Sequence, residues 1–316
     1  MIVAVEEKQK HGDARCHAQQ READGRYGVA WSCRRSPFAP GSHGGSMTQS
    51  RAPFSFFSVG ATHTGCVREL NEDAFIENTA AGLWAVADGV GGAAAGDHAS
   101  QVVVAALNRV GPQVNTAELL AAARGKLDEA NADLLAYAAQ EGLEHVAATV
   151  AALLCSGLEY AVLWAGDSRI YRLRERTLVA LTHDHSAVQE LVDRGVLSSQ
   201  QGLNHPSRNI ITRAVGATAR LELAHIEGRI EPDDLFLLCS DGLTKVASDE
   251  EIGAVLVDAR PEAAPGRLVE LALSRGAPDN LTVVVVTCSA SALSRFSDMP
   301  GVITAATNAL RALWHK

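Results

Sequence analysis

Several apolar, strand-like runs in this 316-residue chain have an aspartate at one end. The pairs of aspartate and run are Asp88 after 83–87, Asp167 after 160–166, Asp241 after 235–240 and Asp279 before 281–286. Short runs bounded by Gly, Asp and Asn are typical of strands that end in loops. Carboxylates on strand ends can be held rigidly around one point, as a hard divalent cation requires. The pattern therefore predicts a sheet protein built around a Mg²⁺ or Mn²⁺ site.

A single aspartate of this set has a simpler interpretation. Asp-Gly after a strand is a common hairpin turn, and both Asp88 and Asp241 are followed by glycine. Turn chemistry alone does not explain why several strand ends carry aspartate. A further acidic cluster, Asn71-Glu72-Asp73, precedes another apolar run. We therefore favour the metal site over a set of unrelated turns.

Charge and composition exclude some classes of function. The net charge is −9 and no basic stripe is present, which argues against a nucleic-acid partner. No apolar stretch reaches the length of a membrane-spanning helix, and the N-terminus lacks the apolar core of a secretory signal. The six cysteines show no C-x-x-C spacing, and Cys155, Cys239 and Cys288 lie in or beside apolar runs. We expect buried free thiols and a cytoplasmic protein.

The chain divides into three segments by composition. Residues 1–46 are polar and lack the periodicity of a helix or strand, so we expect a disordered extension or a mis-assigned start, with Met47 as the true start. Residues 47–289 are expected to form the folded domain. Residues 290–316 form a tail with the pattern of a short amphipathic helix.

Short strands and helices alternate through the folded segment without a linker. The predicted strands are 54–60, 73–78, 83–87, 147–155, 159–165, 169–174, 177–181, 222–228, 235–239 and 281–287. The predicted helices are 94–110, 116–141, 184–194, 249–257 and 262–275. Two helices precede a block of tightly connected strands, an order that indicates an α+β fold with antiparallel sheets and segregated helices.

The segment 182–217 is a long interruption between strands, which is typical of a lid or binding loop. It opens with His183 and His185, an H-x-H pair that can bind zinc. The pair lies far in sequence from the aspartates, so we favour a polar capping role for both histidines. The Gly-rich run 89–92 matches neither the Walker loop nor the G-x-G-x-x-G pattern of nucleotide-binding proteins. The G-x-S-x-G motif of serine hydrolases is also missing.

The remaining chemistry centres on a metal-activated water. Oxygen ligands without a nearby His/Cys set select Mg²⁺ or Mn²⁺ over zinc. We assign Asp88 as the carboxylate that bridges two ions, with the backbone carbonyl of Gly89 as a further ligand. Arg68 stands four residues before Glu72, where a guanidinium fork could hold two phosphate oxygens. Taken alone, Arg68 fits a solvated surface residue better.

Seven motifs occur in order: GATHTGCVRELNEDAF (60–75), VADGVGG (86–92), AGDSRIYRL (165–173), THDHS (182–186), ITRAVG (211–216), LLCSDGLTKVASDEEI (237–252) and PDNLTVVVV (278–286). This series resembles the PP2C-type (PPM) metal-dependent serine/threonine protein phosphatases, and most of all their compact bacterial stand-alone members. The resemblance covers roughly residues 54–288. It implies a four-layer α-β-β-α sandwich, in which two antiparallel β-sheets are flanked by helices.

The resemblance also implies a role for each matching residue. Asp88 would bridge two metals, with Glu72 and the Gly89 carbonyl on one, Asp241 and Asp279 on the other, Asp167 on a third and weaker ion, and Arg68 on the substrate phosphate. Residues 182–210 would form the mobile flap over the site.

Two positions depart from the family pattern. Val90 replaces the histidine that follows Asp-Gly in some eukaryotic relatives, so protonation of the leaving group must come from a metal-bound water or from elsewhere. Ala147-Ala148-Thr149 replaces Gly-Thr-Thr before the central strand, which removes a glycine but no ligand, so we expect tuning and not inactivity.

The function that follows from the resemblance is hydrolysis of phosphoserine and phosphothreonine in proteins. The enzyme would be a monomer that binds two or three Mn²⁺ or Mg²⁺ ions. Its partners would be phosphoprotein substrates, including a bacterial Ser/Thr kinase or its targets. Control of type VI secretion is one setting for short members of this kind, for which the sequence carries no direct sign. Two alternatives remain open: a catalytically silent phosphoprotein-binding module on the same fold, and a hydrolase of small phosphorylated molecules.

Overall fold

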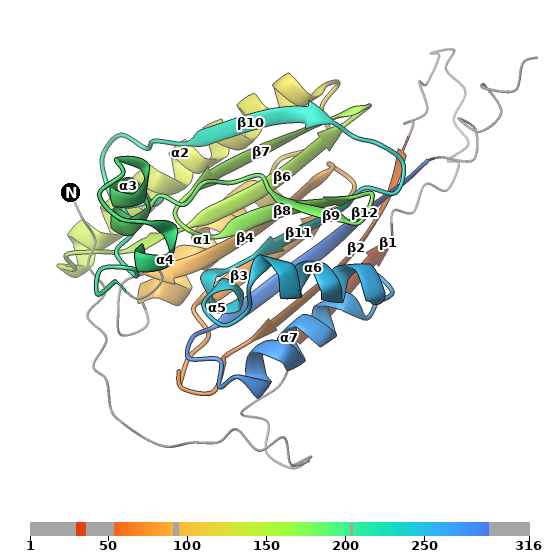
Figure 1. Cartoon of the computed structure of the whole chain (residues 1–316). Helices are drawn as coiled ribbons and strands as arrows, with labels where there is room; N and C mark the ends of the chain where they lie inside the picture. Colours follow the sequence, from red (N-terminus) through yellow and green to blue (C-terminus); the bar gives the residue numbers. More distant parts are fainter. Residues whose placement is uncertain (1–29, 36–53, 91–94, 203–204, 291–316) are drawn as a thin grey trace, which may run out of the picture.

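Two six-stranded antiparallel sheets are formed by the residues that the structure describes (Figure 1). The computed structural model describes residues 30–35, 54–90, 95–202 and 205–290. The first sheet has the order β1-β2-β12-β11-β8-β9, and the second has the order β10-β7-β6-β4-β3 with β5 paired to β4.

The strands of the first sheet are β1 (Ala30–Arg35), β2 (Phe54–His63), β12 (Leu281–Ala290), β11 (Leu235–Cys239), β8 (Arg169–Arg174) and β9 (Thr177–Ala180). The strands of the second are β10 (Ala224–Arg229), β7 (Glu159–Ala165), β6 (Val150–Ser156), β4 (Leu83–Val90), β3 (Asp73–Asn78) and β5 (Ala147–Ala148).

Helices cover the outer face of each sheet. On the second sheet lie α1 (Ala95–Asn108) and α2 (Thr116–Glu141), and on the first lie α6 (Asp249–Asp258) and α7 (Ala264–Ser274). Three shorter helices complete the set: α3 (Ala187–Asp193), α4 (Ser199–Gly202) and α5 (Asp241–Thr244). None of the described helices combines the length and apolar character needed to cross a membrane.

The period-two alternation of the strands builds this layering. In β4, Leu83 and Ala85 face the helices, whereas Trp84 and Val86 face the layer between the sheets. The valines of β12 divide in the same way between the helices α6 and α7 and the inter-sheet layer. Three apolar layers result, and the family's four-layer α-β-β-α arrangement and the α+β class are confirmed.

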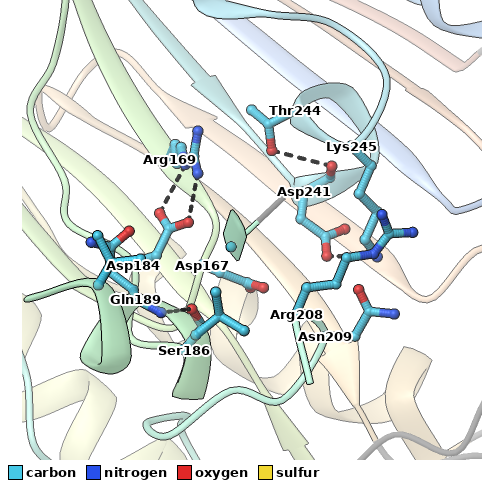
Figure 2. Close-up of a pocket in the computed structure, with 13 residues that line it drawn as sticks. Asp167, Arg169, Asp184, Ser186, Gln189, Arg208, Asn209, Asp241, Thr244 and Lys245 are labelled. Carbon is cyan, nitrogen blue, oxygen red and sulfur yellow. Dashed lines mark hydrogen bonds and ion pairs between the residues drawn. The ribbon is translucent and has the colours of Figure 1, made fainter. Parts of the chain in front are cut away.

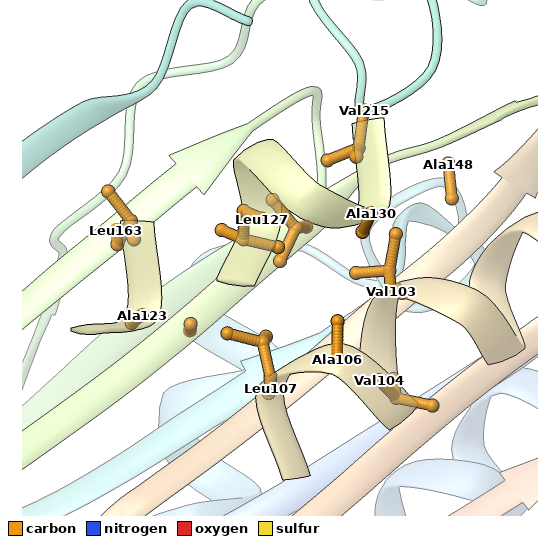
Figure 3. Packing of buried hydrophobic residues seen from close by; sticks show 14 of the residues in the cluster. Val103, Val104, Ala106, Leu107, Ala123, Leu127, Ala130, Ala148, Leu163 and Val215 are labelled. Carbon is orange, nitrogen blue, oxygen red and sulfur yellow. The ribbon is translucent and has the colours of Figure 1, made fainter. Parts of the chain in front are cut away.

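The helix pair on the second sheet packs through small and branched side chains. Val103 and Leu107 of α1, Leu127 of α2 and Leu163 of β7 belong to one buried cluster (Figure 3). The cap of α2 sets its register, because the Asn115 side chain accepts a hydrogen bond from the Glu118 N–H at 2.8 Å. This rigid layer supports the edge of the sheet at which the aspartates lie.

The element predictions are correct in kind, with differences at their ends. The helix predicted over 116–141 has these bounds, whereas 147–155 divides into β5 and β6. The short helices α4 and α5 were not predicted, because four residues carry too little periodicity to detect.

The strand β1 lies in the N-terminal extension, where the sequence predicts none. It pairs antiparallel with β2 from Ala30↔Thr62 to Arg35↔Phe57. An edge strand is held through backbone groups, so it forms without the apolar alternation that sequence analysis detects. The rest of residues 1–46 and the tail from residue 291, including its predicted helix, lie outside the described residues.

Candidate active site

Five carboxylates gather at the edge of the second sheet where β4 ends and β3 begins. Asp73 and Asp88 stand directly opposite each other in the register of β3 and β4. Asp73, Asp241, Asp279 and Asp167 all lie close enough to Asp88 to interact with it electrostatically. Burial, and then these negative neighbours, raise the pKa of Asp88 well above its ordinary value. The structure therefore brings together the aspartates that the sequence singled out.

The local structure at two of these aspartates differs from a simple strand end. Asp88 lies inside β4, because β4 continues to Val90 through pairing with β3 and β5. Asp241 is the first residue of the helix α5. The hairpin-turn interpretation is therefore wrong for both Asp-Gly pairs.

The carboxylates are suited to a hard cation. Asp73 Oδ2 accepts a hydrogen bond from Ser240 Oγ at 2.7 Å, but Asp73 Oδ1 and Asp241 Oδ1 are buried without a hydrogen-bond partner among the described residues. Burial and the neighbouring carboxylates raise the pKa of Asp73 to about 7 and that of Asp167 to about 8. Buried acceptors of this kind are stabilised by a bound cation. An all-oxygen donor set of this kind fits Mg²⁺ or Mn²⁺.

Gly89 is required at its position by close packing. A Cβ on Gly89 would lie 2.0 Å from the carbonyl oxygen of Gly96 in α1. The Gly89 N–H donates to the Glu72 carbonyl at 3.1 Å, so the backbones of β4, α1 and the loop before β3 meet here. The Glu72 side chain lies against Gly96, and burial raises its pKa although Arg68 opposes the shift. The backbones of Glu72 and Gly89 therefore meet next to Asp88.

Asp279 is held by two cations. Arg68 contacts it with Nε at 2.8 Å from Oδ1 and with Nη2 at 3.1 Å from Oδ2. Lys245 Nζ lies 2.6 Å from Asp279 Oδ2 and 2.7 Å from Asp241 Oδ2. Burial alone would raise the pKa of Asp279, but Lys245 and Arg68 outweigh it and hold this pKa below its usual value. Within the described ranges, no three Asp, Glu, His or Cys side chains are arranged as ligands of one metal ion.

The loop that carries Arg68 and Glu72 is fixed by one buried asparagine. Asn280 Oδ1 accepts from the Glu72 N–H, and Asn280 Nδ2 donates to the carbonyls of Thr64 and Leu70, each at 2.8 Å. At Gly65, φ is +84° and a Cβ would lie 2.2 Å from the Asp279 carbonyl oxygen. The loop 64–72 is therefore tied to the start of β12 beside Asp279.

Thr149 fixes the backbone of Asp88. Its Oγ1 accepts from the Asp88 N–H at 3.0 Å and pairs with Ser168 Oγ at 2.8 Å, while its own N–H donates to the Asp88 carbonyl at 2.8 Å. Ala147 and Ala148 depart from the family pattern, but Thr149, whose side chain holds the Asp88 backbone, is retained. Val90 packs against an apolar cluster that includes Ala147, Ile211 and Ala214.

The segment 182–217 borders a pocket of about 270 Å³ next to the carboxylates. Figure 2 shows the Arg169–Asp184 pair on one side of this pocket and Asp241 with Lys245 on the other. Arg169 holds Asp184 through two hydrogen bonds, from Nε at 2.8 Å and from Nη2 at 2.6 Å. This bidentate ion pair ties the start of the segment to β8.

The two histidines of this segment make separate contacts. His183 Nε2 pairs with Asp193 Oδ2 at 2.8 Å. His185 stacks on Trp164, with ring centroids 5.9 Å apart, and its Nδ1 accepts from the Gly166 N–H at 3.3 Å. Neither histidine caps α3, whose N-cap is Ser186, so the predicted capping role is wrong. Burial lowers the pKa of His185 to about 4.

Sequence reasoning assigned no role to three residues of the site: Asp73, Lys245 and Asn280. For Asp73 the signal was present, since it belongs to the acidic cluster before β3, but only the strand register places it opposite Asp88. Lys245 stands four residues after Asp241, a spacing that indicates contact once a helical turn is known. Burial would lower the pKa of Lys245, but its two carboxylate partners hold this pKa above its usual value.

The three buried cysteines that the structure describes lie in the core strands β6, β11 and β12. Cys155, Cys239 and Cys288 are buried, and together with Cys66 they are free thiols. The prediction of buried free thiols is confirmed for those three. Burial raises the pKa of each, which keeps these thiols protonated and unreactive.

Comparison with known proteins gives the same assignment as the motifs. Residues 59–263 match the Protein phosphatase 2C family. The serine/threonine protein phosphatase PstP of Mycobacterium tuberculosis is 40% identical over 223 residues, which cover 70% of this chain. The chain spans only 43% of the length of that relative.

Two solved structures extend the comparison. PppA, described as a key regulatory component of T6SS in Pseudomonas aeruginosa, shares 42% identity and a TM-score of 0.69, over 74% of this chain and 97% of PppA. The catalytic domain of PstP in complex with two manganese ions shares 34% identity and a TM-score of 0.68, over 75% of this chain and 99% of that domain. Family match, fold and clustered carboxylates agree: the chain belongs to the PP2C family of protein phosphatases.

Proposed function

We propose that this chain is a metal-dependent protein serine/threonine phosphatase. The observation that carries the proposal is the convergence of Asp73, Asp167, Asp241 and Asp279 around Asp88, with buried carboxylate oxygens that lack a hydrogen-bond partner among the described residues. A cluster of negative charge without a cation is unfavourable in a buried setting. The family to which the chain belongs supports the same activity.

Each residue predicted from the sequence has a proposed role. Asp88 would bridge two cations, with Glu72 and the Gly89 carbonyl on one side and Asp241 and Asp279 on the other. Asp167 would hold a third ion. The two Mn²⁺ ions in the PstP domain support this count and this metal, and Mg²⁺ is the second candidate. When bound, such ions supply an activated water and offset the charge of a phosphoryl group.

The protein's own groups would orient the substrate. The Arg68 guanidinium adjoins the carboxylates, and its fork of donors suits two phosphate oxygens. The pocket beside Asp167, with Arg208 and Asn209 on its rim, offers polar contacts for the peptide around the phosphorylated residue. Val90 cannot transfer a proton, so the leaving alkoxide would take its proton from a metal-bound water or from another group of the site.

The proposed partners follow from the activity. Phosphoproteins would be the substrates, including a bacterial Ser/Thr kinase or its targets. The similarity to PppA supports a role in type VI secretion. We also propose a cytoplasmic monomer whose phosphatase domain spans 47–289, with β1 as an added edge strand.

Turnover of a phosphothreonine peptide by the full chain tests the activity, with Mn²⁺, Mg²⁺ or EDTA and with Asp241→Asn alongside. We expect metal-dependent hydrolysis that EDTA abolishes and the substitution reduces at least ~10²-fold, since the metals provide the nucleophile and charge stabilisation. A folded protein that binds Mn²⁺ but turns over no phosphopeptide would exclude this activity. Turnover of small phosphoesters alone would then identify a small-molecule hydrolase, and no turnover at all would identify a silent phosphoprotein-binding module.

A further inference from the structure

The ammonium group of Lys245 occupies the edge of the carboxylate cluster formed by Asp241 and Asp279. Its Nζ lies 2.7 Å from Asp241 Oδ2 and 2.6 Å from Asp279 Oδ2, and only 16% of the side chain is exposed. Contacts of this length to two carboxylates are those of a charge-assisted bridge. A cation therefore already bridges these two aspartates, and it belongs to the protein.

The backbone directs Lys245 to this place. Asp241 begins α5 and Lys245 is its C-cap, one helical turn later, and the Lys245 N–H donates to the Asp241 carbonyl at 2.8 Å. Side chains four residues apart on a helix lie on the same face. Lys245 and Asp241 thus belong to the same helical turn, and their contact is local in sequence.

We propose that the Lys245 ammonium is a tethered cation that competes with the divalent metal ion for Asp241 and Asp279. The inference rests on the proposed function, in which these two carboxylates bind a metal. The same oxygen atoms, Oδ2 of both residues, cannot be shared by an ammonium and a doubly charged ion, because the two cations repel each other at such distances. Metal binding through these two oxygen atoms therefore requires the ammonium to move.

The pocket beside the cluster provides a place for the displaced side chain. Lys245 lines it together with Asp167 and Asp184, so a swing of the flexible four-carbon stem keeps the ammonium near carboxylates. Lys245 already interacts electrostatically with Asp167. The cost of breaking the present bridge weakens metal binding, and Lys245 therefore sets the metal concentration at which the site fills.

Calorimetric titration of the metal-free full chain with Mn²⁺ tests this competition. Lys245→Met removes the charge at nearly constant length, and Lys126→Met is a matched control, because Lys126 makes a similar 2.7 Å contact with Glu129 on α2, outside the site. We expect Lys245→Met to lower the Kd of the Mn²⁺ ion held by Asp241 and Asp279 at least ~10-fold, because the ammonium no longer has to be displaced; a tenfold change corresponds to about 1.4 kcal/mol. Lys126→Met should leave this Kd unchanged.

A second readout concerns stability. Without metal, Lys245→Met removes the ion-pair partner of Asp241 and leaves Asp279 paired with Arg68 alone. The Tm of the metal-free variant should therefore fall below that of the metal-free wild type, and saturating Mn²⁺ should raise the Tm of the variant by more than it raises that of the wild type. If Lys245→Met does not fold without metal, Lys245→Gln takes its place in both measurements. An equal or higher Kd in the variant would overturn the competition. A wild-type chain that binds no Mn²⁺ would instead contradict the proposed function itself.

Discussion

The site combines a central group of carboxylates with two positively charged side chains, Arg68 and Lys245, at its edge. Both of these side chains form an ion pair with Asp279. This arrangement keeps the site folded and partly neutralised without metal. It also places a guanidinium where a substrate phosphate would approach.

Arg68→Ala should lower kcat/KM for a phosphothreonine peptide by about 10- to 100-fold, because a bidentate charge-assisted contact to phosphate contributes about 1.5–3 kcal/mol. Arg68→Lys should restore little of this, since an ammonium cannot form the fork. Arg109→Ala is the control, at an exposed arginine near the end of α1 that pairs with Glu129. Steady-state kinetics at saturating Mn²⁺ would measure the effect, and values within threefold of wild type would exclude a phosphate contact.

His185 gives the protein a pH-dependent contribution to stability. Its pKa of about 4 in the folded chain lies below the value of about 6.5 in an unfolded chain, so the unfolded state binds more protons between these values. Its contribution is complete above about pH 6.5 and is lost as the pH falls toward about 4. His185→Asn keeps an acceptor for the Gly166 N–H but does not titrate.

Urea unfolding at pH 7 and pH 5 measures this contribution. The wild type should lose about 1–2 kcal/mol more than His185→Asn between the two pH values, less than the full shift because the ring is partly solvated. Equal losses in both proteins would show that His185 does not control the acid sensitivity.

Among the elements, the loop 64–72 depends on Asn280 for its position. Asn280→Ala removes three hydrogen bonds and leaves the Thr64 and Leu70 carbonyls without this donor. We expect kcat/KM for the phosphopeptide to fall at least ~10-fold and the Kd for Mn²⁺ to rise, because Arg68 and Glu72 lose their anchor. Amide hydrogen exchange in 64–72 should become faster.

Asn78→Ala provides the comparison. Asn78 also joins a loop to backbone groups, through the Val110 carbonyl at 3.1 Å and the Ala81 N–H at 3.2 Å, but it lies at the other end of β3. This variant should lose stability without a change in Mn²⁺ affinity. If both variants bind Mn²⁺ equally, Asn280 has only a structural role.

The sequence predicts elements better than it predicts contacts between them. The continuous apolar strand 235–239 is found with its predicted bounds, because its two faces are buried in different layers. The four-residue helix α5 and the edge strand β1 escape detection, since neither depends on periodicity. Asp73 and Asn280 were missed as site residues for a related reason, since their roles arise from register and loop packing between segments distant in sequence. Lys245 was missed because its contact with Asp241 depends on the undetected helix α5.

The whole molecule is a sandwich whose inter-sheet layer determines its stability. Trp84 is fully buried there, with its ring centroid 5.3 Å from that of Phe56, and its Nε1 has no hydrogen-bond partner among the described residues. Trp84→Ala should cost about 3–5 kcal/mol in free energy of unfolding, because it leaves a large cavity. Trp84→Phe should cost far less, since it also removes a buried unpaired donor. Urea denaturation measures both, and a loss of less than 1 kcal/mol for alanine would contradict the packing.

The layered architecture was predictable from the order of strands and helices together with the seven motifs. The metal-ligand assignments remain predictions, because they depend on how the two sheets and the loop 64–72 close around bound ions. A substitution of Asp88 tests these assignments best, because Asp88 is proposed to bind both ions, whereas each neighbouring ligand is proposed to bind one ion.

The most direct measurement is the number of Mn²⁺ ions bound per chain at equilibrium, in the wild type and in Asp88→Asn. We expect at least two ions in the wild type and a loss of affinity at two sites together in the variant, by at least ~10-fold, because Asp88 would be shared by both ions. Thermal melts without metal would verify that the variant is folded. A wild type that binds no Mn²⁺, or a variant that keeps one site at full affinity, would contradict the two-metal centre.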